Sequence, residues 1–209
     1  MMNKTNFYKF FGLIFILFSV ACTKENHLKN FNININFPDF FNPNAIKISD
    51  NLSFLYSTED NSSHVFLIHS ETYGSRSQFD ETKIQQIIYD FNRFYRSLLL
   101  IRNLQNGDDS FSVLDRKFLN SLPELIVDNE SEIKHQFINI NNNYSLKIEK
   151  NLICKDSTLG SIPAVYYLIH NKNKNKICYV QYFAVSSDKG KSKSDQLAMI
   201  SAIERSSVY

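Results

Sequence analysis

Hydrophobic and polar residues alternate strictly over residues 31–37, where phenylalanine or isoleucine takes every second position and asparagine the others. A period of two predicts a strand with one buried face, which Pro38 ends. Looser alternation over residues 46–58 and the apolar run HVFLIHSE at 64–71 predict two further strands. These would form a hairpin that turns at the polar residues 59–63.

The longest helical pattern runs from residue 80 to about residue 102. Its apolar residues recur at spacings of three and four, which predicts an amphipathic helix covering one face of a sheet. They are Ile84, Ile87, Ile88, Phe91, Phe94, Tyr95, Leu98 and Leu99. Ser77 and Asp80 have the spacing of a capping box, and Asn106 with Gly107 supplies a stop. A second, shorter helix is predicted over residues 109–121.

From residue 133 onward the pattern predicts an antiparallel meander. Its strands are expected at 134–140, 144–154, 162–170 and 177–186, separated by polar, turn-rich loops. A last helix, capped by Ser192 or Ser194, would turn Leu197, Ile200 and Ile203 inward and pack on the same layer as the long helix. The fold class is therefore α+β, an antiparallel sheet with helices packed on it.

The same meander bears on the two downstream cysteines, Cys154 and Cys178. Cys154 ends its strand, and Cys178 begins the strand two positions later, which runs in the same direction. The two residues should thus lie about 25 Å apart, whereas a disulfide requires roughly 4.4–6.8 Å between Cα atoms. Two unpaired thiols are expected.

The apolar run at residues 10–21 predicts where the protein works. As a helix it would be about 18 Å long, well short of the roughly 30 Å hydrocarbon core, and Lys4 and Lys9 precede it. It therefore favours a secretion signal, and Ala21 directly before Cys22 resembles the lipobox of bacterial lipoproteins. Ser19 departs from the leucine usual three residues before the cysteine.

The lipobox resemblance implies that Cys22 is acylated and becomes the mature N-terminus. Thr23 after the cysteine resembles an outer-membrane address, with the domain facing the periplasm of the cell envelope. The alternatives are an ordinary cleaved signal or an uncleaved anchor. The expected organisation is a signal peptide at 1–21, a polar tether at 22–30 and one globular domain at 31–209.

Charge narrows the class of partner. Without Lys4 and Lys9 the 23 basic residues fall to 21, equal to the 21 acidic ones, so the mature chain is formally neutral. A neutral chain lacks the electrostatic footprint that nucleic-acid binding requires. Nucleic acid is thus not an expected partner, whereas a membrane, through lipid on Cys22, is.

Residues typical of catalysis or cofactor binding do not cluster. The five glycines are far apart, which argues against phosphate-binding loops, and no GxSxG turn is present. His64 and His69 are five apart on one predicted strand and so point to opposite faces, which argues against a shared metal site. We expect no catalytic centre, no metal and no cofactor.

Aromatic residues are more suggestive, with 18 Phe and 11 Tyr. Four tyrosines crowd the last predicted hairpin: Tyr166, Tyr167, Tyr179 and Tyr182. Because neighbours on a strand alternate, some should face away from the helices and form a protein-binding surface. The alternative is that another helix, such as residues 109–121, covers them.

The order of these elements resembles the DcrB-like lipoproteins, which belong to the PsbP-like fold superfamily. The similar features are the lipobox cysteine, FNININFPDFF at 31–41, the hairpin at 46–70, the helix at 81–102, the final hairpin at 159–187 and LAMISAIERS at 197–206. Residues 103–130 depart from the family. The resemblance implies an α/β/α sandwich that binds other macromolecules and usually has no catalytic centre.

Three functions are therefore open. The first is an envelope lipoprotein whose domain binds another envelope protein without catalysis. The second is an immunity-type lipoprotein that inhibits an antibacterial toxin. The third is a small-ligand carrier or enzyme that uses a pocket between the helix layer and the sheet.

Overall fold

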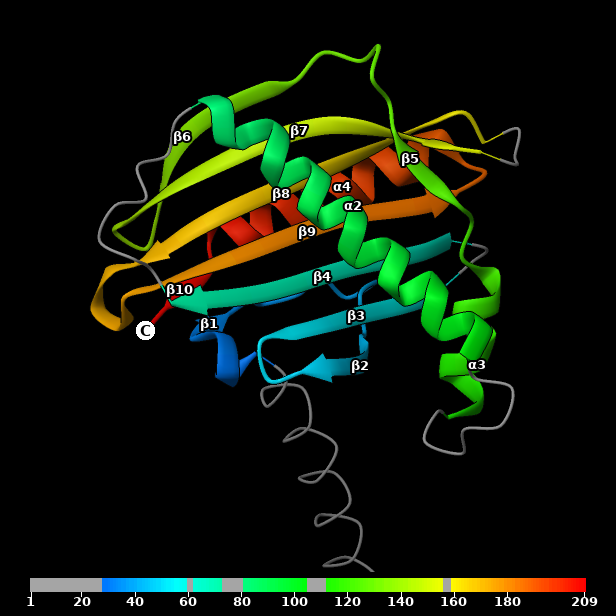
Figure 1. The fold of residues 1–209 in the computed structure, drawn as a ribbon, viewed down its shortest axis with the longest axis horizontal. Coiled ribbons are helices and arrows are strands. Elements are labelled where there is room, and N and C mark those ends of the chain that lie inside the picture. Colours follow the sequence, from blue (N-terminus) through cyan, green and yellow to red (C-terminus); the bar gives the residue numbers. More distant parts are fainter. Residues whose placement is uncertain (1–27, 60–61, 73–80, 105–111, 156–158) are drawn as a thin grey trace, which may run out of the picture.

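The computed structural model describes residues 28–59, 62–72, 81–104, 112–155 and 159–209 (Figure 1). Its main feature is an eight-stranded antiparallel sheet with the order β2-β3-β4-β9-β8-β7-β5, in which β6 also pairs with β7. The strands are β2 (Asn44–Ser49), β3 (Leu52–Glu59), β4 (Ser62–Thr72), β5 (Leu125–Val127), β6 (Lys134–Ile140), β7 (Asn143–Cys154), β8 (Ser161–Asn171) and β9 (Lys176–Ser186). The predicted α+β class is confirmed.

Three α-helices and several short elements complete the described fold. The helices are α2 (Glu81–Leu104), α3 (Val113–Ser121) and α4 (Lys189–Glu204). The short elements are the 3-10 turns η1 (Lys29–Phe31) and η2 (Lys172–Lys174) and a separate two-stranded pair, β1 (Ile33–Asn34) with β10 (Ser207–Val208). Among the described residues, no helix has the length and apolar character needed to cross a membrane.

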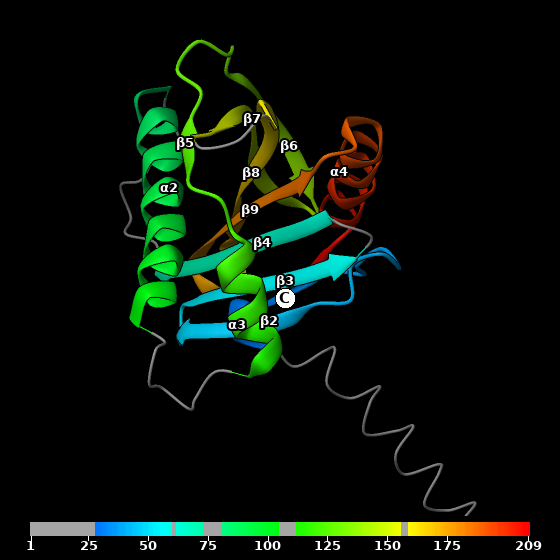
Figure 2. The same ribbon diagram turned by 90° about the vertical axis from the view of Figure 1, so that its right-hand side faces the viewer.

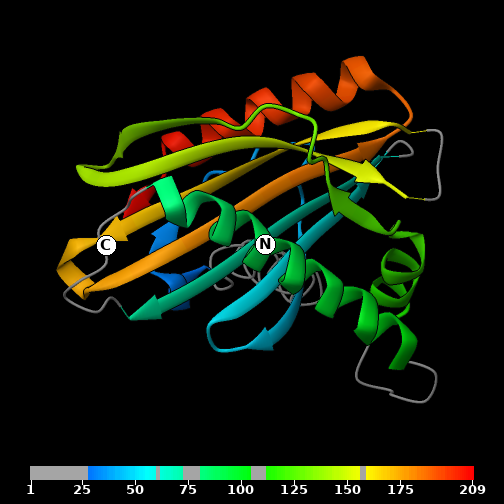
Figure 3. The same ribbon diagram turned by 45° about the horizontal axis from the view of Figure 1, so that its top comes forward.

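The helices lie on opposite faces of the sheet, so the domain has three layers. Figure 2 shows α2 on one side and α4 on the other, and Figure 3 shows α3 near one end of α2. The prediction that the last helix shares a layer with the long helix was wrong. The physical reason is that the central strands are apolar on both faces, as at residues 65–68 of β4, so each face requires a cover.

Two hydrophobic clusters follow from this arrangement. One lies under α2 and α3 and includes Val65, Leu67, Phe91 and Tyr166. The other lies under α4 and the N-terminal segment and includes Phe66, Ile68, Tyr182, Met199 and Ile203. Successive residues of β4 enter different clusters, because neighbouring side chains on a strand point to opposite faces.

The predicted strand at 31–37 is mostly irregular. Only Ile33 and Asn34 are paired, because their partner β10 is two residues long, and Asn32 adopts a left-handed φ of 55° after η1. The predicted inward face is nevertheless correct, since Phe31, Ile33 and Ile35 are buried. Leu28 is buried as well, so the domain begins within the segment expected to be a tether.

Other boundaries also differ. The stretch predicted as one strand at 46–58 forms β2 and β3, joined by a tight turn, and β5 was not predicted. Helix α4 begins before the expected serine caps, because the Asp188 side chain accepts a hydrogen bond from the Lys191 N–H. Leu197 is 58% exposed rather than inward. The expected caps at residues 77–80 and 106–107 lie outside the described residues.

Candidate functional site

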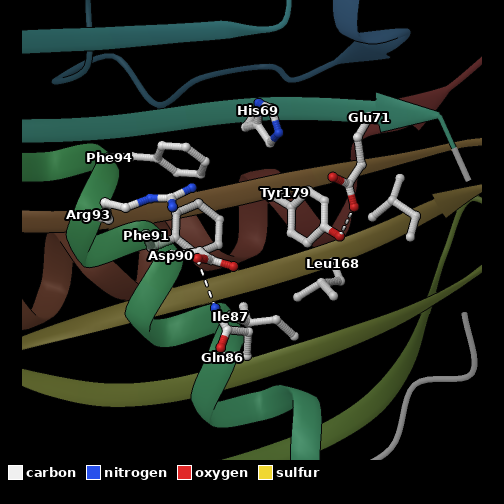
Figure 4. Close-up of a pocket in the computed structure, with 11 residues that line it drawn as sticks. His69, Glu71, Gln86, Ile87, Asp90, Phe91, Arg93, Phe94, Leu168 and Tyr179 are labelled. Atoms are coloured by element: carbon white, nitrogen blue, oxygen red, sulfur yellow. Dashed lines mark hydrogen bonds between the residues drawn. The ribbon is translucent and has the colours of Figure 1, made fainter. Parts of the chain in front are cut away.

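A cleft of about 380 Å³ opens between the first half of α2 and the sheet (Figure 4). Its lining comes from β4, β8, β9 and α2 and combines charged, polar and aromatic side chains. The lining residues are His69, Glu71, Gln86, Ile87, Asp90, Phe91, Arg93, Phe94, Leu168, Ile177 and Tyr179. Small-molecule sites begin at about 300 Å³, so the cleft is large enough to hold a side chain or a small ligand.

The sheet side of the cleft is built by strand register. His69 of β4 pairs with Tyr179 of β9, and Tyr179 pairs in turn with Leu168 of β8, so these three side chains form a row across the sheet. Glu71 lies two residues beyond His69 and therefore points to the same face. This face is the one that α2 covers.

Helical spacing supplies the other side. Ile87, Phe91 and Phe94 follow one another at intervals of four and three, and they face the sheet. Asp90 and Arg93 lie beside them at the edge of the helix. The three apolar side chains pack on the sheet, and Asp90 and Arg93 give the cleft a charged rim.

Four aromatic rings make up much of the cleft, and we call them the four-ring cluster: His69, Phe91, Phe94 and Tyr179. Their centroids form a closed circuit. His69 lies 5.0 Å from Phe94 and 5.8 Å from Tyr179, while Phe91 lies 6.3 Å from each of the same two rings. The Arg93 guanidinium lies 5.8 Å from the Phe94 centroid, which is a cation–π distance.

Hydrogen bonds orient the polar groups of the cleft. The Tyr179 hydroxyl donates to Glu71 Oε1, and Gln86 Nε2 donates to Asp90 Oδ1 over 3.0 Å. His69 Nδ1 lies 2.8 Å from the Asn51 carbonyl oxygen. Burial raises the pKa of Tyr179 well above its usual range, and the hydrogen bond and charge of Glu71 with the charge of Asp90 add to the effect. Tyr179 is thus a neutral donor at physiological pH.

The tyrosines predicted to form an exposed surface do not do so. Tyr166, Tyr167 and Tyr182 are all 0% exposed, and only Tyr179 is half-buried. Helices cover both faces of this hairpin: Tyr166 and Tyr179 face α2, whereas Tyr167 and Tyr182 face α4. The helix at 113–121 covers Tyr56 instead, whose ring stacks on Phe118 at 3.9 Å.

His64 and His69 point to opposite faces of the sheet, as predicted. His64 is fully buried under α4, where Nδ1 lies 2.9 Å from the Tyr182 hydroxyl and Nε2 lies 3.8 Å from Asp195 Oδ2. Burial lowers the pKa of His64, Lys191 adds to this, and Asp195 opposes it. This row of side chains resembles a proton relay, but His64 and Tyr182 are 0% exposed and Asp195 only 7%, which leaves no open site for a substrate.

The structure also bears on the cysteines and on possible metal ligands. Cys154 and Cys178 are free and buried, so the prediction of two unpaired thiols is confirmed. The described residues contain no group of three or more His, Cys, Asp or Glu side chains able to hold a metal ion. Cys22 lies outside the described part of the chain, so its acylation stays a prediction.

The sequence contained only partial signals for the cleft. A period of two placed His69 and Glu71 on one strand face, and helical spacing grouped the residues of α2. Nothing local indicated that these two faces meet, and of the cleft residues only Tyr179 was among the predicted site residues.

Comparison with known proteins identifies no family for this chain. No family model matches it, and no curated protein matches it. Among solved structures, it is similar to the solution structure of cyanobacterial PsbP (CyanoP) from Synechocystis sp. PCC 6803. That alignment has a TM-score of 0.46 and 11% sequence identity, and it covers 87% of this chain and 88% of the other.

Proposed function

We propose that the chain is a lipid-anchored envelope protein whose domain binds another envelope protein through the cleft between α2 and the sheet, without catalysis. Acylated Cys22 would hold the protein on a membrane. The expected membrane is the outer membrane, with the domain facing the periplasm. The apolar segment at 10–21, which ends in Ala21 directly before Cys22, supports this part of the proposal.

The observation that carries the binding function is the convergence of charged groups and four rings in one concave site. Protein-binding sites combine aromatic anchors with a polar rim, and here Phe91 and Tyr179 form part of the floor while Asp90 and Arg93 form part of the rim. Among the described residues, the lining contains no serine, threonine, cysteine or lysine, and Tyr179, Glu71 and His69 are already engaged in hydrogen bonds. This arrangement supports recognition better than covalent catalysis.

A second candidate function is that of a small-ligand carrier. The volume of about 380 Å³ favours it, because it falls within the range of small-molecule pockets. A carrier would bind its ligand without forming a complex with another envelope protein, and the two functions therefore differ in whether the cleft contacts a protein in the cell.

Site-specific photocrosslinking in the native envelope tests the proposal. A benzophenone amino acid replaces Gln86, which is exposed at the cleft, in the full-length chain. The matched control carries it at Leu197, which is 58% exposed on α4 across the sheet. We expect a discrete protein adduct from position 86 that is absent from position 197. The same adducts from both positions, or no adduct from position 86, would contradict docking through the cleft.

A further inference from the structure

Most polar groups in the cleft are able to accept a hydrogen bond rather than donate one. The Asn51 carbonyl can only accept, so His69 Nδ1 donates the hydrogen of this contact. The Tyr179 hydroxyl hydrogen is already directed to Glu71. Each carboxylate has room for further donors, because it accepts at about four sites. A ligand that fits these groups must therefore donate.

The charges around Tyr179 are negative. Glu71 accepts the hydrogen bond of the Tyr179 hydroxyl, so its carboxylate is in contact with this ring. The charge of Asp90 also raises the pKa of the phenol, by a smaller amount than Glu71. Among the described lining residues, Arg93 is the one cation, and it lies over Phe94. Figure 4 places Arg93 and Phe94 at one end of the cleft and Glu71 with Tyr179 at the other. Asp90 is drawn beside Phe91 on the Arg93 side, so Glu71 is the carboxylate at the opposite end, which we call the anionic end.

The four-ring cluster adds a second attraction for a cation. A positive charge is attracted to the face of an aromatic ring within about 6 Å, and Arg93 already uses one such face. Tyr179 stands at the anionic end, away from Arg93, whereas Phe91 lies on the Arg93 side of the cleft (Figure 4). Ile87, Leu168 and Ile177 supply an apolar wall along which a methylene stem can lie.

We propose that the anionic end of the cleft binds a primary alkylammonium group, supplied by a lysine side chain of the docked protein. The ammonium contacts Glu71 and the ring of Tyr179, the charge of Asp90 adds a longer-range attraction, and the stem follows the apolar wall. A lysine fits better than a free diamine, because the second charge of a diamine would approach Arg93. This inference rests on the proposed docking function and names the group that the cleft recognises.

Nuclear magnetic resonance of the full-length chain in a maltoside detergent tests the assignment. A choline-type detergent is avoided because it carries a quaternary ammonium. The probe is Nα-acetyl-lysine N-methylamide, and ¹³C-labelled His and Tyr rings report binding. We expect saturable shifts at His69 and Tyr179 and none at the exposed His135. The matched control ligand, Nα-acetylnorleucine N-methylamide, has the stem without the charge and should cause no shift.

Variants of the charged residues sharpen the test. Glu71→Gln and Asp90→Asn should each weaken binding of the lysine probe about two- to fivefold, as expected for partly exposed ion pairs. Arg93→Gln removes a like charge and should leave the affinity unchanged or raise it up to about twofold. The control is Glu132→Gln, a carboxylate whose side chain is 77% exposed outside the cleft, and it should bind like the parent chain.

Three results would overturn the inference. The first is shifts at His69 and Tyr179 with succinate but not with the lysine probe, which would indicate an anion site. The second is binding of free cadaverine without binding of the lysine probe. The third is no shift with any amine at millimolar concentration. If the photocrosslink at position 86 persists in that last case, the docking function stands and only the ammonium assignment fails.

Discussion

Tyr166 and Tyr167 are neighbours in the chain, yet they belong to different cores of the protein. One packs under α2 and the other under α4, because successive side chains of a strand point to opposite faces. Tyr167 donates to Glu204 Oε1 over 3.0 Å, and Tyr182 lies beside His64. The hydroxyls of Tyr167 and Tyr182 thus lie beside polar side chains, which offsets the cost of burying them.

His64 should make stability depend on pH. Burial holds the pKa of His64 in the folded state below its ordinary value of about 6.5. Between the folded-state and unfolded-state pKa values, the unfolded state therefore binds more protons than the folded state. The free energy of unfolding should fall as the pH drops below about 6.5. We expect a lower free energy of unfolding in urea at pH 5.5 than at pH 7.5, with a smaller difference in His64→Gln. Some slope will remain, because burial also lowers the pKa of His170. His135→Gln is the control, and an unchanged slope in His64→Gln would contradict the assignment.

The two free cysteines should be inert in the folded chain. Both are buried, and burial raises the pKa of Cys178 to about 12, so its reactive thiolate is scarce. In a Cys22→Ser background, we expect a thiol reagent such as Ellman's reagent to modify neither residue at pH 8 without denaturant. Two equivalents should react in urea. Rapid reaction of either thiol in the native chain would contradict the prediction, because it would show that the surrounding structure opens readily to solvent.

Helix α4 is held on its face of the sheet partly by a charge network at its end. Lys147 of β7 lies 3.1 Å from Glu204 and 3.2 Å from Glu149, and its side chain is only 10% exposed. Glu204 stands at the helix C-terminus, where a negative charge is unfavourable. The lysine therefore compensates a charge that also anchors Tyr167.

Removing this lysine should loosen the attachment of α4. Lys147→Met keeps the stem but leaves Glu204 without its cation, and we expect a loss of about 1–2 kcal/mol in the free energy of unfolding in urea. The matched control is Lys134→Met, whose pair with Glu132 has side chains 68% and 77% exposed. That change should cost less than about 0.5 kcal/mol. Equal effects of the two substitutions would show that the network contributes nothing.

At the scale of the whole molecule, the sheet separates two environments. Its α2 face carries one hydrophobic cluster and the open cleft, whereas its α4 face carries the other cluster and the buried row around His64. The described chain begins at Leu28, which packs into the α4-side cluster. Only residues 23–27 separate that packed position from Cys22, so we expect a lipid anchor to hold the domain close to the membrane.

Intact mass tests the anchor. We expect the protein extracted from its native membranes to begin at Cys22 and to carry the additional mass of acyl chains. The Cys22→Ser variant should lack this mass and leave the membrane fraction. A native chain that is full-length, or cleaved without added mass, would contradict lipidation and would leave an ordinary signal or an uncleaved anchor.

Elements with a sustained period were predictable from the sequence. The long helix was expected from residue 80 to about 102 and spans Glu81–Leu104, and the ends of the four meander strands lie within one residue of their expected positions. Their patterns are local, because a half-buried strand has an apolar residue at every second position and a half-buried helix has one at every third or fourth position. Opposite placement of His64 and His69 and the separation of Cys154 from Cys178 followed from the same periods.

Tertiary structure alone decided which surfaces meet. The inward stripe of α4 includes Ser192 and Asp195 besides Met199 and Ile203, so its pattern did not indicate which face it covers or that Leu197 points outward. Residues 31–37 alternate like a strand but find only a two-residue partner. The cleft likewise depends on β4 and α2 meeting across the sheet. Local periodicity determines which side of an element is buried, whereas the partner on that side depends on contacts between distant segments.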